Sequence, residues 1–166
     1  MLDTRNYTAL ITPFNSQGQI DMVTLLTLAR AQAAAGNGII LFGSTGEGLS
    51  LTQDEKTQIL NNILADKPNT NVLVTVPGTQ LFESLAWIDA CNAHKIDGYL
   101  LASPIYTKPG QFGQINWFNA CLDQAKHPCM LYNIPGRSGC TISAETVAIL
   151  SQHPRCLALK ESSGNI

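Results

Sequence analysis

A short apolar run of strand-forming residues, then a loop, then a helical stretch recurs along the whole chain. The six candidate strands are Thr8–Thr12, Gly38–Phe42, Asn71–Val76, Gly98–Ala102, Cys129–Asn133 and Cys156–Lys160. The helical stretches between them are Met22–Ala35, Thr52–Ala65, Thr79–Lys95, Gln111–Gln124 and Ser143–His153. The repeat is roughly 30 residues long, the size of one β–α–β unit. This pattern predicts an α/β fold built on a parallel sheet.

The candidate strands are continuous apolar runs, as expected when a parallel sheet is covered by helices on both faces. No linker or low-complexity stretch divides the chain, so residues 1–166 are predicted to form a single domain. Six β–α units fit either a doubly wound open sheet or a (β/α)8 barrel. The glycine-rich segment Gly43–Gly48 contains neither GxGxxG nor a Walker lysine, which disfavours a nucleotide site in an open sheet.

A barrel carries its chemistry on the loops that follow the carboxyl ends of its strands. The polar residues suited to chemistry in this chain lie at the ends of candidate strands or just after them; they are Ser44, Thr45, Tyr106, Tyr132, Arg137 and Lys160. In a barrel these positions converge on one mouth. Their placement therefore favours a barrel over an open sheet.

Composition and charge exclude several classes of function. The net charge of −2 leaves no basic excess that would hold nucleic acid. The apolar stretches are too short and interrupted for a membrane span, and the segment Met1–Arg5 does not begin a signal peptide, so a cytoplasmic location is expected. The five cysteines include no CxxC pair, and the three histidines precede strands at the opposite end of the barrel. No metal site is predicted.

Lys160 closes an apolar strand, where a lysine must either reach solvent or serve a special role. A lysine amine is normally protonated and is then a poor nucleophile. Removal from water favours the neutral amine, which can attack a ketone to form a Schiff base. The alternative reading is a lysine paired with a carboxylate at the rim of the barrel.

Four other residues match the needs of Schiff-base chemistry. Imine formation requires proton transfer to a departing oxygen, which Tyr132 and Ser44 could relay. The amides of the Gly-Ser-Thr-Gly loop and the Thr45 hydroxyl suit a carboxylate, and Arg137 suits a second one. Each residue also has a structural reading, as a turn former, a core aromatic or a solvated loop charge. Their common placement after strands favours the functional one.

Several segments of the chain resemble the pyruvate-dependent class I aldolase and lyase family, which includes dihydrodipicolinate synthases and N-acetylneuraminate lyases. The segments are Thr8–Phe14 (TALITPF), Gly43–Glu47 (GSTGE), Ser103–Tyr106 (SPIY), Leu131–Pro135 (LYNIP) and Leu159–Glu161 (LKE). The resemblance implies a (β/α)8 TIM barrel, of which this chain would supply about the first six β–α units. Lys160 would form the Schiff base with pyruvate, and no separate cofactor would be needed. Thr45 would bind the pyruvate carboxylate, and Tyr132 would be the catalytic tyrosine with Ser44 as its relay partner. Tyr106 would reach into the site of a neighbouring subunit of a homotetramer, a dimer of dimers.

The choice among members of this family depends on two positions. Arg137, within Gly136–Cys140 (GRSGC), resembles the synthases, in which this arginine binds the carboxylate of aspartate semialdehyde. Ser44 departs from their usual threonine and is more similar to the lyases. The resemblance therefore implies a lyase that condenses pyruvate with aspartate semialdehyde to 4-hydroxy-tetrahydrodipicolinate in lysine biosynthesis. A sister aldolase that cleaves N-acetylneuraminate or a 2-keto-3-deoxy sugar acid is the alternative.

The chain stops at Ile166, directly after the sixth candidate strand. A barrel of this family needs two more strands, and an unclosed barrel exposes sheet edges and an apolar interior. We therefore expect the 166-residue chain to be a C-terminally incomplete barrel with little activity by itself. A catalytically silent fragment that acts through assembly or binding is the third alternative.

Overall fold

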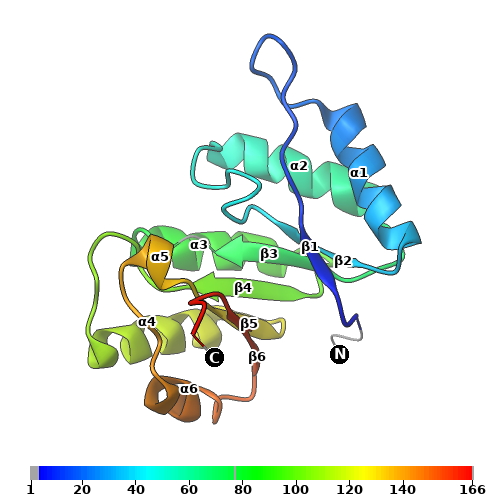
Figure 1. Ribbon diagram of the computed structural model, residues 1–166. Coiled ribbons are helices and arrows are strands. Elements are labelled where there is room, and N and C mark those ends of the chain that lie inside the picture. The colour runs from blue at the N-terminus through cyan, green and yellow to red at the C-terminus, as the bar shows by residue number, and fades with distance from the viewer. Residues whose placement is uncertain (1–3, 77, 166) are drawn as a thin grey trace. The chain divides into compact units, whose positions relative to one another are not determined.

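The structure is a computed structural model that describes residues 4–76 and 78–165 (Figure 1). Its strands are β1 (Tyr7–Ala9), β2 (Gly38–Leu41), β3 (Val72–Val76), β4 (Gly98–Ala102), β5 (Cys129–Asn133) and β6 (Cys156–Glu161). Its helices are α1 (Met22–Ala34), α2 (Gln53–Ala65), α3 (Leu81–Asn92), α4 (Gln111–Gln124), α5 (Pro135–Ser138) and α6 (Ala144–Leu150). The chain divides into two compact units. The first runs to Thr75 and includes His94–Asp97, and the second comprises Val76–Ala93 and the residues from Gly98 onward.

The first unit carries three parallel strands in chain order. Thr8 is the partner of Ile39 in register, and Ile40 is the partner of Leu73. All residues of β2 and β3 are buried, as expected for strands covered on both faces. Helix α1 packs against β2 and α2. Helix α2 begins at a capping box, in which Thr52 and Glu55 each bond the other's backbone N–H.

The second unit continues the same pattern with β4, β5 and β6 in parallel register. Helix α3 packs against α4, and α4 packs against α6 (Figure 1). The α3 face that faces the core is made by Ser84, Trp87, Ile88 and Cys91, which are three or four residues apart or adjacent, as on one side of a helix. Between Cys129 and Met130 the register against β6 shifts, so that Met130 pairs with Ala158.

The predicted elements are all present, and the larger differences are at the end of β1, at both ends of α3, at the end of α6 and at α5. Strand β1 ends at Ala9, before the predicted Thr12, because the Thr12 hydroxyl bonds the Gly46 carbonyl and Pro13 has no N–H for a ladder. Helix α6 ends at Leu150, three residues short of His153, in a turn closed by the His153 N–H. Helix α5 was not predicted from the sequence.

None of the helices in the described ranges is long and apolar enough to cross a bilayer. The residues form two compact units, and the single domain over residues 1–166 stays a prediction.

Candidate active site

Lys160 and Tyr132 face each other across the pair formed by β5 and β6. They are partners in register, and the Lys160 Nζ lies 4.1 Å from the centroid of the Tyr132 ring. Tyr132 is 7% exposed, whereas Lys160 is half-buried. An ammonium group over an aromatic face is attracted by the negative face of the ring. The structure therefore brings together two of the six predicted site residues.

The next pair in register, Asn133 and Glu161, is joined by a hydrogen bond that the sequence analysis missed. Asn133 Nδ2 donates to Glu161 Oε2 at 2.7 Å, and Asn133 is 2% exposed. The Asn133 Oδ1 accepts the Ile142 N–H at 2.9 Å, which fixes which end of the amide points to Glu161. A buried asparagine at the end of a strand was the only sequence signal for this contact.

The Glu161 carboxylate is bound by a side chain of β5 and by the turn that follows β6. Its Oε1 accepts the Ser163 N–H at 2.6 Å. The bond from the Asn133 side chain, followed by those from Ser163, lowers the pKa of Glu161 from its ordinary value. The carboxylate is therefore held ionised next to the strand end that carries Lys160.

Arg137 lies in the last turn of the short helix α5. Pro135 occupies the first turn, where its missing N–H costs nothing, and Gly139 ends the helix in the left-handed conformation with φ of 73°. Ser138 is 2% exposed, and its hydroxyl bonds the carbonyls of Ile134 and Cys140. The exposed Arg137 side chain thus projects from a turn that is well fixed.

Tyr106 lies on the loop after β4 and is 93% exposed. Its φ is 70°, in the left-handed region that costs a residue with a side chain about 1 kcal/mol or more. The Ile105 N–H donates to the Gly78 carbonyl at 2.6 Å. A side chain at Gly78 would collide with the Ser103 carbonyl, so the close approach of these two segments requires glycine.

Gln114 anchors the same loop and is a second residue that the sequence analysis missed. It is 4% exposed on the core face of α4. Its Oε1 accepts the Ser103 hydroxyl at 3.3 Å, and its Nε2 donates to the carbonyls of Pro109 and Thr141 at 3.2 Å each. Gln114 therefore ties the loop that carries Tyr106 to the segment that follows Arg137.

Ser44 and Thr45 lie in an exposed turn of the first unit, after β2. The N–H groups of Glu47 and Gly48 donate to the carbonyls of Ser44 and Gly43, whereas those of Ser44, Thr45 and Gly46 are not donors in the turn's hydrogen bonds. A side chain at Gly48 would collide with the Phe42 carbonyl, and one at Gly46 would lie 2.6 Å from the Leu10 carbonyl. These glycines are needed for the tight turn that presents Ser44 and Thr45.

The predicted site residues therefore all lie at the carboxyl ends of strands: Tyr132 and Lys160 are the penultimate residues of β5 and β6, and the other four follow a strand. Ser44 and Thr45 belong to the first unit, and Tyr106, Tyr132, Arg137 and Lys160 belong to the second. The catalytic and binding roles of these residues stay predictions. Within residues 4–76 and 78–165, no group of three or more histidine, cysteine, aspartate or glutamate side chains could hold a metal ion.

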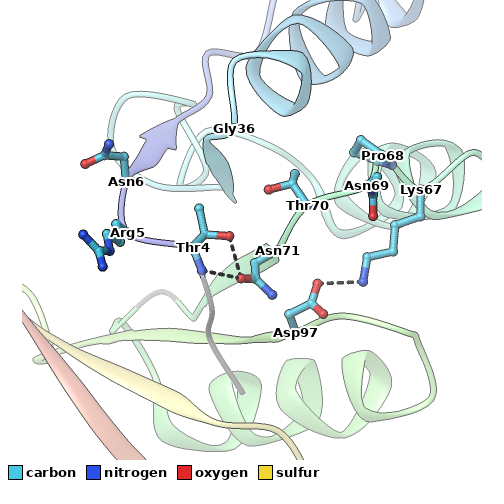
Figure 2. Close-up of a pocket in the computed structure, with 10 residues that line it drawn as sticks. All are labelled: Thr4, Arg5, Asn6, Gly36, Lys67, Pro68, Asn69, Thr70, Asn71 and Asp97. Atoms are coloured by element: carbon cyan, nitrogen blue, oxygen red, sulfur yellow. Dashed lines mark hydrogen bonds and ion pairs between the residues drawn. The ribbon is translucent and has the colours of Figure 1, made fainter.

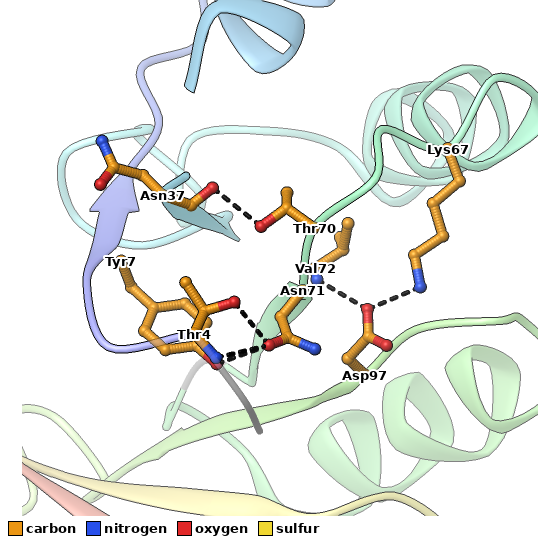
Figure 3. Close-up of polar contacts among 8 residues, drawn as sticks. All are labelled: Thr4, Tyr7, Asn37, Lys67, Thr70, Asn71, Val72 and Asp97. Atoms are coloured by element: carbon orange, nitrogen blue, oxygen red, sulfur yellow. Dashed lines mark hydrogen bonds and ion pairs between the residues drawn. The ribbon is translucent and has the colours of Figure 1, made fainter. Parts of the chain in front are cut away.

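A cavity of about 850 Å³ lies at the opposite, amino-terminal ends of the strands in the first unit (Figure 2). Its lining residues are Thr4, Arg5, Asn6, Gly36, Lys67, Pro68, Asn69, Thr70, Asn71 and Asp97. Asn71 Oδ1 accepts bonds from Thr4 and from the Tyr7 hydroxyl, and Lys67 pairs with Asp97 at 2.6 Å (Figure 3). Because these polar groups bind one another, we assign this region a structural role.

Comparison with known proteins gives a consistent result over the whole chain. A model of the dihydrodipicolinate synthetase family matches residues 3–166. The 4-hydroxy-tetrahydrodipicolinate synthase of Wolbachia pipientis subsp. Culex pipiens is 46% identical over 167 residues, which cover 100% of this chain and 57% of that protein. This chain thus spans a little over half the length of that relative.

Two crystal structures are similar in fold. Dihydrodipicolinate synthase from Bacillus anthracis superposes with a TM-score of 0.94 and 31% identity, over 99% of this chain and 57% of the other. The chloride-inhibited enzyme from Acinetobacter baumannii, complexed with pyruvate, gives a TM-score of 0.91 and 28% identity, over 97% and 56%. These likenesses confirm the predicted fold class, about six β–α units of a (β/α)8 barrel.

Proposed function

The chain belongs to the dihydrodipicolinate synthetase family, and from this premise we propose that the protein forms a Schiff base with pyruvate on Lys160. It then condenses the bound pyruvate with aspartate semialdehyde to give 4-hydroxy-tetrahydrodipicolinate. The observation that carries the proposal is the position of the Lys160 Nζ, 4.1 Å from the centroid of the Tyr132 ring. An amine and a phenol in contact at the carboxyl ends of two strands are the groups that imine chemistry needs.

In the proposed reaction the neutral Lys160 amine attacks the keto carbon of pyruvate. A carbon–nitrogen bond forms, and the carbonyl oxygen leaves as water after it has received protons. Tyr132 acts as the acid that delivers a proton to this oxygen, and Ser44 relays the proton to Tyr132. The buried environment of Tyr132 supports the assignment, because bulk water would otherwise compete for the proton.

Two groups bind the carboxylates of the substrates. Thr45 binds the carboxylate of pyruvate. The backbone N–H groups of the turn around Ser44 that do not donate within the turn support this role. Arg137 binds the carboxylate of aspartate semialdehyde. An exposed guanidinium group on a well-fixed turn is suited to this contact. The reaction needs no cofactor beyond the lysine–pyruvate imine.

A homotetramer is part of the proposal, with Tyr106 inserted into the site of a neighbouring subunit. A tyrosine that is 93% exposed at a strained backbone position supports such a contact, since a neighbouring subunit would bury its ring. A cytoplasmic location and a role in lysine biosynthesis also belong to the proposal.

A sister aldolase that cleaves N-acetylneuraminate is the second candidate, and Ser44 is the residue that favours it. The test is an assay of the gene-encoded protein with pyruvate and aspartate semialdehyde, in parallel with N-acetylneuraminate cleavage. We expect turnover only in the first assay. Arg137→Ala should raise the KM for aspartate semialdehyde by about tenfold or more, the effect of losing one charge-assisted contact. Cleavage of N-acetylneuraminate without the condensation would contradict the proposal.

A further inference from the structure

The contact between Asn133 and Glu161 lies one residue beyond the proposed reacting pair on each strand. We propose that Asn133 and Glu161 are positioning residues that hold Lys160 over Tyr132 and thereby set the rate of imine formation. The inference rests on the proposed function. It adds two residues, neither of which touches pyruvate, to the groups that the reaction needs.

Register is the first step of the argument. Tyr132 pairs with Lys160, and Asn133 pairs with Glu161. Because successive side chains of a strand point to opposite faces, the Asn133–Glu161 bond lies on the other face of the sheet from the Lys160–Tyr132 contact. It can therefore fix the two strands against each other without occupying the site.

Strand β6 needs such a bond because its pairing with β5 is irregular. The register shifts between Cys129 and Met130, where one additional β6 residue is accommodated. A slip of one residue would move every β6 side chain to the opposite face, and with it Lys160. The Asn133–Glu161 bond joins the strands after the irregularity, at the end where Lys160 lies.

The direction of the bond is fixed on the Asn133 side. Asn133 Oδ1 accepts the Ile142 N–H, so that Nδ2 is the group presented to Glu161 at 2.7 Å. The Asn133 backbone carbonyl accepts the Ser162 N–H at 2.9 Å and extends the ladder past Glu161. A hydrogen bond to an ionised carboxylate is about twice as strong as one between neutral groups.

The same contacts keep the Glu161 carboxylate occupied on its own face of the sheet. One oxygen accepts from Asn133 and the other accepts from Ser163. The carboxylate is therefore held on the face of the sheet opposite Lys160 and Tyr132, and its bonds fix the end of β6 without entering the site.

The experiment exchanges the donor and the acceptor of the Asn133–Glu161 hydrogen bond in the gene-encoded protein. Asn133→Asp places two carboxylates against each other and should lower the rate of borohydride trapping with pyruvate by about tenfold or more, as misplaced reacting groups do. Adding Glu161→Gln restores a donor and an acceptor in reversed order, and should return the rate to within about threefold of wild type. Glu145→Gln, an exposed carboxylate on α6, is the matched control and should leave the rate unchanged.

A second measurement does not depend on turnover. Reductive ¹³C-methylation of Lys160, assigned by the loss of its signal in Lys160→Arg, reports the ring current of Tyr132. We expect the ring-current shift to vanish in Asn133→Asp and to return in the double variant. An unchanged shift in Asn133→Asp would overturn the positioning role. Failure of the wild type to trap pyruvate would instead overturn the proposed function, whatever the shift shows.

Discussion

The Lys160 Nζ and the Tyr132 ring are in contact across β5 and β6, at 4.1 Å from nitrogen to centroid. The ring holds the amine in place, and the phenol is proposed to move the proton. These two roles can be separated, because the ring remains when the hydroxyl is removed. The contact therefore gives the first prediction.

Tyr132→Phe should lower the rate of pyruvate imine formation by about 10²–10⁴-fold, the usual contribution of a general acid. The fold should be preserved, because the buried ring and its contact with Lys160 remain. Tyr132→Ala should in addition destabilise the protein by about 3–5 kcal/mol. Trapping with borohydride measures the rate, and urea unfolding measures the stability. A wild-type trapping rate in Tyr132→Phe would exclude the phenol as the proton donor.

Gln114→Leu should destabilise the protein by about 2 kcal/mol, since the carbonyls of Pro109 and Thr141 lose their donor and the buried Ser103 hydroxyl loses its acceptor. We expect a lower urea midpoint at an unchanged m-value. Gln111→Leu, on the exposed face at the start of α4, is the control and should change stability by no more than about 0.5 kcal/mol. Equal effects of the two substitutions would show that the buried amide has no special role.

The order of the elements could be predicted from the sequence because each apolar strand is bounded by clear signals. The bounds of β4, β5 and α4 agree with the predicted ones, and Gly98, Pro128 and Gly110 mark their starts. Helix α5 could not be predicted, because four residues carry no helical period and its end is fixed by bonds of the Ser138 hydroxyl to the carbonyls of Ile134 and Cys140.

The site could be predicted only in part. Lys160 and Tyr132 were recognisable because polar residues at the ends of apolar strands are unusual. Their contact, and the Asn133–Glu161 bond, depend on the register of β5 against β6, which shifts at Cys129. Residues 28 positions apart give no sequence pattern that reports such a register. Gln114 was missed because a buried glutamine resembles a surface residue in sequence.

Glu55 should make stability depend on acid pH. Its bonds to the backbone and side chain of Thr52 lower its pKa from the ordinary value of 4.5. Its contribution to stability is therefore complete above pH 4.5 and is lost as the pH falls through the lower folded-state value. Glu55→Gln should flatten that part of the acid unfolding curve. Thr52→Ala should cost about 1 kcal/mol at neutral pH. Parallel acid curves for wild type and Glu55→Gln would contradict the assignment.

Asp97 should matter more for stability than its ion-pair partner Lys67. Its Oδ2 accepts the Val72 N–H as well as the Lys67 ammonium, so Asp97→Ala breaks two bonds (Figure 3). We expect a loss of about 2–3 kcal/mol for Asp97→Ala and about 1 kcal/mol for Lys67→Ala. Asp66→Ala, which breaks the exposed pair with Arg30, should cost less than about 1 kcal/mol. Equal urea midpoints for the Asp97 and Lys67 variants would show that the bond to Val72 contributes nothing.

Covalent capture of pyruvate by Lys160 is the most direct test of the account. The gene-encoded protein is incubated with pyruvate and borohydride, digested, and analysed by peptide mass spectrometry. We predict one reduced pyruvate on the peptide that contains Lys160, and none on that peptide in Lys160→Arg. An unmodified Lys160, or an adduct located only on other lysines, would contradict the account.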